Sequence, residues 1–247
     1  MSSNFGGKVA LVTGGGGGIG RALCQVLVRD GAKVVAADRN FQTAQETVSL
    51  LPNPGDHLAV SMDVTSNESI DSAIKAITEK YQTPPSLVAN CAGVLEMAPS
   101  WELDEKTFAN ASDVNFKGTF YVSQAVIKLL LKQQAPGAVV NIASIAGGYG
   151  LRDLSHYSGS KGAVMSLTKA MAGELAKKGI RVNCVLPGLI DTPLVRDTPL
   201  ADSIIPFTAL GRKGQPGEVA EVLAFLLSEK SSYMVGSCVE VTGGYTM

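Results

Sequence analysis

The chain has 247 residues, of which 45% are hydrophobic and 17% are charged, so it is long enough and apolar enough to bury a large core. Its 21 basic and 22 acidic residues give a formal net charge of −1, and no basic patch suggests a nucleic-acid partner. No apolar run approaches the roughly 18 residues of a membrane-spanning helix, so no membrane span is expected.

Cysteine usage and the N-terminus bear on the compartment. The cysteines are far apart and lie in apolar segments, which fits neither a zinc site nor a disulfide framework. We therefore expect no metal site and a reducing compartment. Residues 1–7 contain neither an apolar secretory core nor an Arg-rich presequence, which favours the cytoplasm. The cysteines are Cys24, Cys91, Cys184 and Cys238.

Strand-like and helix-like segments alternate from one end of the chain to the other. Long helical tracts are expected over 104–134 and over 157–178. The alternation predicts a doubly wound α/β fold, in which a single domain over residues 1–247 holds a seven-stranded parallel sheet with helices on both faces. The predicted strands are 9–12, 34–38, 58–62, 87–89, 138–143, 182–186 and 238–241.

A glycine-rich segment joins the first predicted strand to the first predicted helix. Glycines allow the backbone to turn tightly and to approach a pyrophosphate, which then meets the positive end of the helix. A flexible loop is the alternative, but this segment follows a strand and opens an amphipathic helix, as a dinucleotide site requires. The segment reads Thr13-Gly14-Gly15-Gly16-Gly17-Gly18-Ile19-Gly20.

An acidic residue follows at the expected distance from these glycines. Asp38 ends the second predicted strand, 18 residues after Gly20. A carboxylate there accepts hydrogen bonds from the adenosine ribose hydroxyls and repels a 2′-phosphate, which favours NAD. Arg39 could accommodate that phosphate, so NADP is the alternative cofactor. The other reading of Asp38 is a solvated carboxylate at a strand end.

The most informative stretch lies in the second half of the chain. Tyr157 and Lys161 are four residues apart in a predicted helix, so both side chains can point at one site. An ordinary tyrosine has a pKa near ~10, and a nearby cation lowers it. Ser144 closes a predicted strand and could hold a carbonyl oxygen while the tyrosine donates a proton to it. Alone, the Tyr/Lys pair is weak evidence for catalysis, because many helices carry such a pair partly exposed on their surface.

The two histidines receive no catalytic role. His156 is adjacent to Tyr157, but neighbouring helical residues point ~100° apart, so it should face away from the site. We expect His156 to be structural or to contact another subunit. His57 precedes the third predicted strand and has no serine or cysteine partner in view.

Together, the glycine segment and the Tyr157/Lys161 helix resemble the short-chain dehydrogenase/reductase family over essentially the whole chain. The resemblance implies a Rossmann-type fold, with a cofactor-binding first half and a second half that carries the catalytic residues and a substrate lid. The catalytic residues that it implies are Asn115, Ser144, Tyr157 and Lys161, with Ser144 and Tyr157 also binding the substrate. The cofactor-binding residues that it implies are Thr13, Gly14, Gly16, Gly17, Gly18, Ile19, Gly20, Asp38, Arg39, Asp63, Val64, Asn90, Ala92, Gly93, Tyr157, Lys161, Pro187, Gly188, Ile190 and Thr192.

The resemblance also implies individual roles and shows two departures. Lys161 is expected to bind the nicotinamide ribose and, with the oxidised nicotinamide, to lower the pKa of Tyr157. Asn115 is expected to hold a water that links Lys161 to solvent. Cys91 stands where the family has a second asparagine, and Gly159 stands where alanine is usual. A glycine inside a helix costs ~1 kcal/mol and leaves room for a closer neighbour.

Within the family, segments 44–48, 84–86 and 239–244 are similar to a branch of estradiol 17β-dehydrogenases and mitochondrial 3-oxoacyl-acyl-carrier-protein reductases. This similarity implies an NAD-dependent enzyme that interconverts a carbonyl and a secondary alcohol, mainly on 3-oxoacyl thioesters, with 17β-hydroxysteroids as side substrates. A dehydrogenase of steroids or small alcohols stays an alternative, as does a cofactor-binding subunit that acts through a partner chain. The implied location is the mitochondrial matrix, and the implied assembly is a homotetramer or a heterotetramer with a related reductase subunit.

The segment from Pro187 to Gly214 is expected to fold over the substrate. Its apolar residues suit a substrate with an apolar body rather than a sugar. Acyl carrier protein is a candidate partner, and Lys177 and Lys178 match one of the basic positions where related reductases dock it. The apolar lid residues are Leu189, Ile190, Leu194, Val195, Leu200, Ile204, Ile205 and Phe207.

Overall fold

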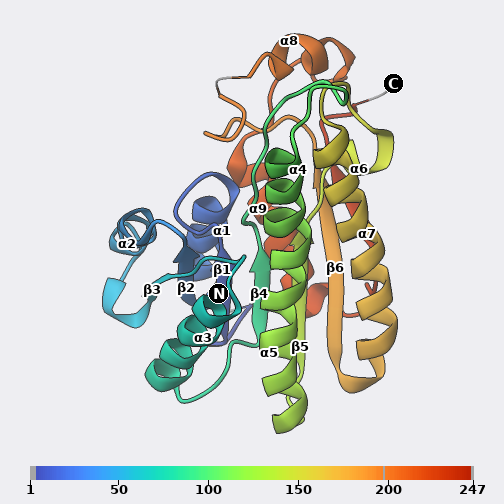
Figure 1. Ribbon diagram of the computed structural model, residues 1–247. Coiled ribbons are helices and arrows are strands. Elements are labelled where there is room, and N and C mark those ends of the chain that lie inside the picture. The colour runs from blue at the N-terminus through green and yellow to red at the C-terminus, as the bar shows by residue number, and fades with distance from the viewer. Residues whose placement is uncertain (1–3, 197, 246–247) are drawn as a thin grey trace.

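The computed structural model of the chain describes residues 4–196 and 198–245, apart from the side chain of Asp202 (Figure 1). Within these residues, seven strands form one parallel sheet in the order β3-β2-β1-β4-β5-β6-β7. The chain starts in the middle of the sheet, runs outward to β3 and returns to pair β4 with the other side of β1. The predicted doubly wound α/β fold is confirmed. The strands are β1 (Val9–Thr13), β2 (Lys33–Asp38), β3 (Leu58–Ser61), β4 (Leu87–Asn90), β5 (Gly137–Ile142), β6 (Ile180–Pro187) and β7 (Cys238–Val241).

Helices cover both faces of the sheet, as Figure 1 shows. Helices α1, α2 and α9 pack on one face, and α3, α5 and α7 pack on the other. Among the described residues, no helix is both long enough and apolar enough to span a membrane. The helices are α1 (Gly18–Arg29), α2 (Phe41–Ser49), α3 (Asn67–Tyr81), α4 (Glu105–Ala111), α5 (Thr119–Gln133), α6 (Ile145–Tyr149), α7 (Ser155–Leu175), α8 (Leu200–Ile204) and α9 (Pro216–Leu227).

Strand β1 explains why the sheet is covered on both sides. Successive strand residues point to opposite faces. Ala10 and Val12 pack with the α1 and α9 layer, whereas Val9 and Leu11 pack with the α3 and α5 layer. Every residue of β1 is buried, so the strand is a continuous apolar run rather than an alternating one.

The long helical tract expected over 104–134 is confirmed, with a π-helical stretch in its middle. A π-helical turn, Ser112–Gly118, separates α4 from α5. The Thr119 hydroxyl donates a 2.8 Å hydrogen bond to the carbonyl oxygen of Asn115 inside this turn. Gly118 packs so closely on Val64 that a Cβ on it would lie 2.7 Å from Val64 Cγ2.

Three segments that follow neighbouring strands meet at the carboxyl edge of the sheet. They are the connection after β4, the connection after β5 that contains α6, and the stretch after β6 that contains α8. Figure 1 shows α8, α6 and the start of α4 at this same end of the molecule. In parallel sheets the crevice at the carboxyl ends of the strands, near the reversal of strand order, is where ligands bind.

Candidate active site

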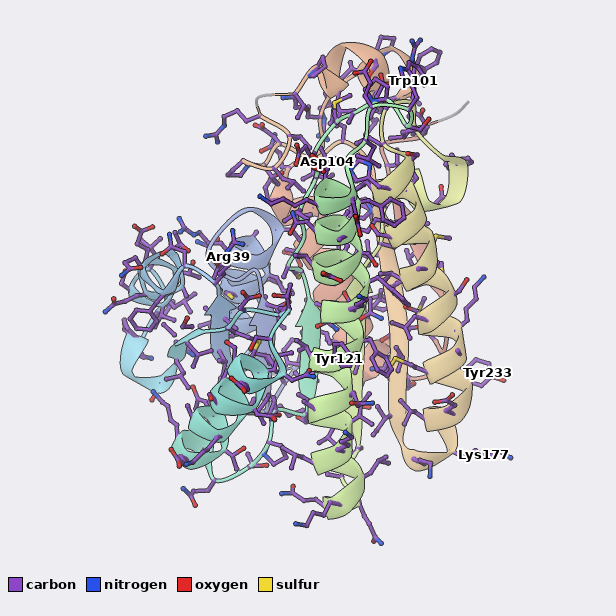
Figure 2. All side chains as sticks on the ribbon, viewed as in Figure 1. Arg39, Trp101, Asp104, Tyr121, Lys177 and Tyr233 are labelled. Carbon is purple, nitrogen blue, oxygen red and sulfur yellow. The ribbon has the colours of Figure 1, made fainter. Side chains whose placement is uncertain are left out.

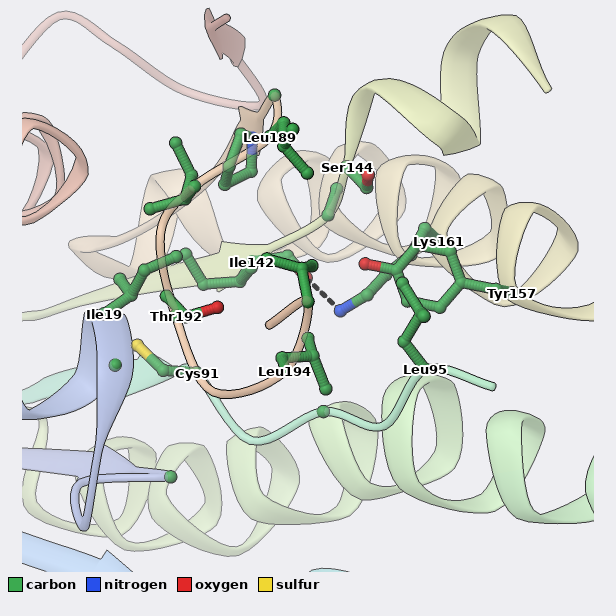
Figure 3. A pocket seen from close by; sticks show the side chains of 18 of the residues that line it. Ile19, Cys91, Leu95, Ile142, Ser144, Tyr157, Lys161, Leu189, Thr192 and Leu194 are labelled. Atoms are coloured by element: carbon green, nitrogen blue, oxygen red, sulfur yellow. Dashed lines mark hydrogen bonds between the residues drawn. The ribbon is translucent and has the colours of Figure 1, made fainter. Parts of the chain in front are cut away.

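A cavity of about 280 Å³ lies at the carboxyl edge of the sheet (Figure 3). Its wall combines the glycine segment before α1 with the ends of β4, β5 and β6, the start of α7 and the lid around α8. The structure therefore brings together residues from both halves of the chain. The predicted site residues that line the cavity are Gly14, Gly17, Gly18, Ile19, Gly20, Asp38, Ala92, Gly93, Ser144, Tyr157, Lys161, Pro187, Gly188, Ile190 and Thr192.

The glycine segment is shaped by close backbone approaches. Gly14 has a φ of +63°, and a Cβ on it would lie 2.9 Å from the backbone nitrogen of Ala92. A Cβ on Gly20 would collide with the carbonyl oxygen of Gly14. Arg21 holds the turn in place, because its Nη2 donates a 2.6 Å hydrogen bond to the carbonyl oxygen of Gly16. Side chains at Gly14 and Gly20 would force these backbone segments apart and so disturb the tight turn that a pyrophosphate site needs.

The N-terminus of α1 adds a suitable charge to this cradle. Its N-cap is Gly17, so no side chain caps the first N–H groups, and the first turn has no acidic residue. Such free N–H groups and the helix dipole together attract an anion. The described residues therefore fit the pyrophosphate of a dinucleotide cofactor.

Asp38 is held at the edge of the cavity by the backbone. Its Oδ2 accepts a 3.0 Å hydrogen bond from the Gly16 nitrogen, and its Oδ1 accepts a 3.0 Å bond from the Asn40 nitrogen. Both bonds fix the plane of the carboxylate beside the glycine turn. Arg39 is exposed and does not line the cavity.

Several predicted cofactor residues support the cavity from outside. Thr13 Oγ1 accepts hydrogen bonds from the backbone nitrogens of Cys91 and Ala92, both at 3.2 Å, and so joins β1 to the segment after β4. Asp63 Oδ1 accepts bonds from the nitrogen and the hydroxyl of Thr65, and these bonds hold the pKa of Asp63 below its usual value. The predicted site residues that do not line the cavity are Thr13, Gly16, Arg39, Asp63, Val64, Asn90 and Asn115.

The Tyr157/Lys161 pair faces Ser144 across the cavity (Figure 3). Lys161 Nζ donates a 2.8 Å hydrogen bond to the carbonyl oxygen of Ile142 and lies 5.8 Å from the centre of the Tyr157 ring. Ser144 caps α6, with its Oγ accepting a 3.1 Å bond from the Ala146 nitrogen, and it lines the same cavity as Tyr157. The phenol and the serine hydroxyl are thus directed at one place.

The Tyr157 pKa was expected to be lowered by Lys161, but in the protein without cofactor it is raised. Burial raises the pKa of Tyr157 to about 12, although the hydrogen bond to Ser144 opposes the change. Burial also lowers the pKa of Lys161 to about 8. The ammonium is directed at the Ile142 carbonyl rather than at the phenol, so loss of hydration outweighs the attraction between the two groups. The protein alone therefore keeps Tyr157 neutral at pH 7.

Asn115 lies directly behind the cavity wall at Gly93 without lining the cavity itself. Its Oδ1 accepts a 2.9 Å hydrogen bond from the Val94 nitrogen, and its Nδ2 donates to the Val94 oxygen at 3.0 Å and to Ser160 Oγ at 3.1 Å. Ser160 in turn donates a 2.7 Å bond to the Tyr157 carbonyl. Asn115 therefore positions the segment after β4 against α7, and its expected role in holding a water that links Lys161 to solvent stays a prediction. His156 is buried and does not line the cavity either.

The lid is apolar, as predicted, but two of its expected members do not line the cavity. Ile205 packs behind the wall, and Phe207 is 57% exposed on the outer surface. The 3-10 turn Ile205–Phe207 after α8 turns Phe207 outward. The expected lid residues that do line the cavity are Leu189, Ile190, Leu194, Val195, Leu200 and Ile204.

Part of the apolar wall was not predicted from the sequence. Most of it comes from the end of β5 and from the segments after β4 and β5, and Pro193 follows β6. Their position after two neighbouring parallel strands was the available signal, because such segments share one edge of the sheet. The unpredicted wall residues are Cys91, Leu95, Ile142, Ala143, Ile145, Leu151, Leu154 and Pro193.

Comparison with known proteins identifies the family of this chain. The model of a protein family described as Enoyl-(Acyl carrier protein) reductase matches residues 14–246. The (3R)-3-hydroxyacyl-CoA dehydrogenase of Homo sapiens is 40% identical over 249 residues, which cover 97% of this chain and 95% of that protein. The chain belongs to the short-chain dehydrogenase/reductase family. Members of this short-chain dehydrogenase/reductase family are oxidoreductases, and this chain is an enzyme that acts on CH–OH and C=O groups.

Alignments with further relatives also cover nearly the whole chain. A 3-oxoacyl-[acyl-carrier-protein] reductase of Thermotoga maritima is 36% identical over 243 residues, 96% of this chain and 97% of that protein. A solved short-chain type dehydrogenase/reductase from Mycobacterium marinum has a TM-score of 0.93 and 34% identity, covering 99% of this chain and 98% of that one. A 3-ketoacyl-(acyl-carrier-protein) reductase from Brucella melitensis, complexed with NADH, has a TM-score of 0.91 and 29% identity, covering 98% and 100%. The short-chain dehydrogenase/reductase fold binds a nicotinamide cofactor, and the glycine cradle fits one.

The buried ammonium should make this short-chain dehydrogenase/reductase less stable than it could be. Because the pKa of Lys161 is about 8 in the folded protein, against 10.5 for an ordinary lysine, folding carries the full cost of the buried charge below pH 8. Lys161→Met should therefore raise the free energy of unfolding at pH 7, by up to about 3 kcal/mol. The advantage should shrink as the pH rises from 8 towards 10.5. Urea unfolding at several pH values measures it.

The control for this experiment is Lys169→Met, which removes an exposed lysine from the same helix α7. Its effect on unfolding should be small at every pH. Two outcomes would contradict the assignment of Lys161 as a costly buried cation. One is that the Lys161→Met protein is less stable than the wild type at pH 7. The other is that the difference in stability between the two proteins does not change with pH.

Proposed function

We propose that this enzyme reduces 3-oxoacyl thioesters with NADH, and that it oxidises 17β-hydroxysteroids more slowly in the same pocket. The observation that carries the proposal is the contrast within the cavity wall. Two hydroxyls, from Ser144 and Tyr157, meet at one place, while the lid and the neighbouring segments contribute apolar side chains such as Leu154 and Leu189. Such a pocket suits a single carbonyl on an apolar body and offers few partners to the hydroxyls of a sugar. The names of the human and Thermotoga maritima relatives support an acyl substrate.

The proposed roles follow from the geometry of three residues. Ser144 and Tyr157 donate hydrogen bonds to the substrate oxygen, where negative charge develops during reduction. Tyr157 then gives its proton to that oxygen, and a phenol that the protein keeps neutral is ready to do so. Lys161 provides positive charge beside the phenol once the proton has left. When bound, the nicotinamide supplies the hydride.

We propose NAD rather than NADP as the cofactor, because of Asp38. Its carboxylate stands beside the glycine turn with a fixed orientation, where it can accept hydrogen bonds from ribose hydroxyls and would repel a 2′-phosphate. The Brucella melitensis relative was solved with NADH, which supports this choice. Arg39 lies next to Asp38 and is the residue through which NADP would be accepted if the carboxylate were removed.

The carrier of the acyl group and the assembly are part of the proposal. Lys177, labelled in Figure 2, lies beyond the far end of α7, 20 residues after Tyr157, which corresponds to about 30 Å along a helix. A carrier docked on Lys177 would therefore lie far from Tyr157 of the same chain. To deliver its acyl group to this active site, the carrier would have to dock on Lys177 of a different subunit. We therefore propose action on free CoA thioesters or on a carrier bound across subunits, within a homotetramer or a heterotetramer with a related reductase. The mitochondrial matrix remains the proposed location, with the cytoplasm as the alternative.

Two alternative functions would use the same site. A dehydrogenase of steroids or other small alcohols would use the same hydroxyls and the same apolar wall. A subunit that acts mainly through a partner chain would bind the cofactor but turn over little by itself. The two are separated by turnover of the isolated protein on a broad carbonyl panel.

Replacing Tyr157 by Phe should abolish turnover while leaving cofactor binding nearly intact. The substitution removes the hydroxyl that we assign as proton donor but keeps the ring that packs in the wall. General acid catalysis contributes about 10²–10⁴-fold, so a loss of that size in kcat is expected. Steady-state kinetics and NADH fluorescence titration measure the two quantities. Tyr121→Phe, on α5, is the control and should behave like the wild type. Retention of more than about a tenth of the wild-type kcat would remove Tyr157 from this role.

Replacing Asp38 by Ser should shift the cofactor preference from NAD towards NADP. Hydrogen bonds to a charged acceptor contribute about 1.5–3 kcal/mol each, so the ratio of kcat/KM for the two cofactors should change at least about tenfold. The double variant Asp38→Ser/Arg39→Ala should lose NAD binding equally but gain less with NADP. A wild-type enzyme that already prefers NADPH would contradict the assignment of Asp38.

The substrate proposal is tested by NADH oxidation with acetoacetyl-CoA and longer 3-oxoacyl thioesters, compared with NAD reduction by estradiol. We expect faster turnover of the thioesters, with the Tyr157→Phe protein as the inactive control for both. If no thioester is reduced, alone or with a candidate partner subunit, while estradiol turns over efficiently, the acyl proposal fails and the steroid alternative stands.

A further inference from the structure

Two cysteines meet where the last two strands of the sheet pair. Cys184 of β6 and Cys238 of β7 are direct partners in the strand register. The thiol of Cys184 donates a hydrogen bond to Cys238 Sγ, with 3.1 Å between the two sulfur atoms. The two residues lie 54 positions apart in the sequence, so no local pattern indicates that they meet. Neither sulfur lines the cavity or takes part in the proposed reaction.

The backbone at this place already has the geometry of a disulfide. Adjacent strands lie about 4.7–4.9 Å apart, within the roughly 4.4–6.8 Å between Cα atoms that disulfides span. Partners in register point their side chains to the same face of the sheet, here towards α7. The start of β7 is fixed to β6, because the Cys184 nitrogen donates to the Ser237 oxygen and the Ser237 nitrogen donates to Asn183 Oδ1, both at 2.9 Å. A bond between the sulfurs thus requires an approach of about 1 Å by side chains rather than a strand movement.

The two thiols differ in how they meet solvent. Cys184 is completely buried, and burial raises the pKa of its thiol. Cys238 lies on the edge strand and is only half-buried. An oxidant that arrives from solvent therefore reaches the Cys238 sulfur first and finds the Cys184 thiol beside it. Cys24 and Cys91 differ from this pair: burial raises the pKa of both thiols, and Cys24, on α1, is completely buried.

We propose that Cys184 and Cys238 form a dithiol site that a hydroperoxide converts into an intrachain disulfide between β6 and β7. The Cys238 thiolate attacks a peroxide oxygen, which gives a sulfenic acid and releases water or an alcohol. The Cys184 sulfur then attacks the Cys238 sulfur and displaces hydroxide, which takes up the Cys184 proton and leaves as water. The two thiols together lose two electrons and two protons, the peroxide is reduced, and a small dithiol reverses the change.

The disulfide would cross-link the edge strand β7 to the neighbouring strand β6. β7 leads directly into Thr242, whose backbone packs against Gly188 of the cavity wall. A cross-link at Cys238 therefore restrains the strand that supports this part of the wall. Because it closes a long loop, it should also stabilise the folded chain. The inference concerns chemistry separate from the proposed reduction of acyl thioesters and does not depend on it.

The proposal is tested by treating the purified protein with hydrogen peroxide, blocking free thiols and digesting with trypsin without reductant. We expect peptides 182–196 and 231–247 to appear as one cross-linked species that lacks two hydrogen atoms, and to separate after dithiothreitol. The oxidised protein should unfold at a temperature several degrees higher than the reduced protein. Cys238→Ser should show neither change, and it should keep its turnover because Cys238 lies outside the cavity.

Cys184→Ser provides the second variant, in which Cys238 should stop at the sulfenic acid or proceed to higher oxides. If the buried serine prevents folding, the Cys238→Ser comparison alone still decides. The proposal is overturned if Cys238 of the wild type is oxidised to sulfinic acid without cross-linking, if its cross-links join different chains, or if Cys238 stays reduced while Cys24 or Cys91 reacts.

Discussion

The hydrogen bond from the Lys161 ammonium to the Ile142 carbonyl, at 2.8 Å, is the interaction on which the rest of the site depends. It joins α7 to the end of β5. Tyr157 lies one helical turn before Lys161, and Ser144 lies two residues after Ile142, so the same bond brings the phenol and the serine hydroxyl together. The surrounding apolar core makes the ammonium costly, which lowers the pKa of Lys161 to about 8. The buried ammonium of Lys161 thus destabilises the folded protein at the place where the proposed chemistry needs a cation.

A second set of buried hydrogen bonds supports the helices that carry the site. Asn90 Nδ2 donates to Ser123 Oγ of α5 and to Asn141 Oδ1 of β5, both at 2.8 Å, and Asn141 Nδ2 donates to Thr168 Oγ1 of α7 at 2.9 Å. Two strands are thereby joined to two helices by side chains that no solvent reaches. Breaking such a buried bond leaves a polar group without a partner at a cost in free energy, so these bonds restrict how α5 and α7 can pack on the sheet. This explains why Asn90 supports the cavity without lining it.

The sequence predicted the fold class and most of the polar site, because both depend on local spacing. The alternation of strands and helices along the chain predicts the doubly wound sheet. Tyr157 and Lys161 are four positions apart in a helix, and this spacing places both side chains on one face of it. Three features could not be predicted, since each depends on contacts between distant segments. The π-helical turn before α5 follows from close packing on the segment after β3, and the apolar wall around Leu95 and Leu154 comes from loops without periodicity. The raised pKa of Tyr157 follows from burial, which spacing does not reveal.

The central claim is that burial decides the protonation of the Tyr157/Lys161 pair in the protein alone. The direct test is the ultraviolet tyrosinate absorbance of the wild type minus that of the Tyr157→Phe protein, followed from pH 7 to a pH about half a unit above the ordinary tyrosine pKa of ~10. Our account predicts almost no difference over this range, because the Tyr157 pKa is about 12. A tyrosinate signal in the difference spectrum that appears at or below pH ~9, where an ordinary tyrosine is still neutral, would show that the lysine rather than burial controls the phenol, and would contradict the account.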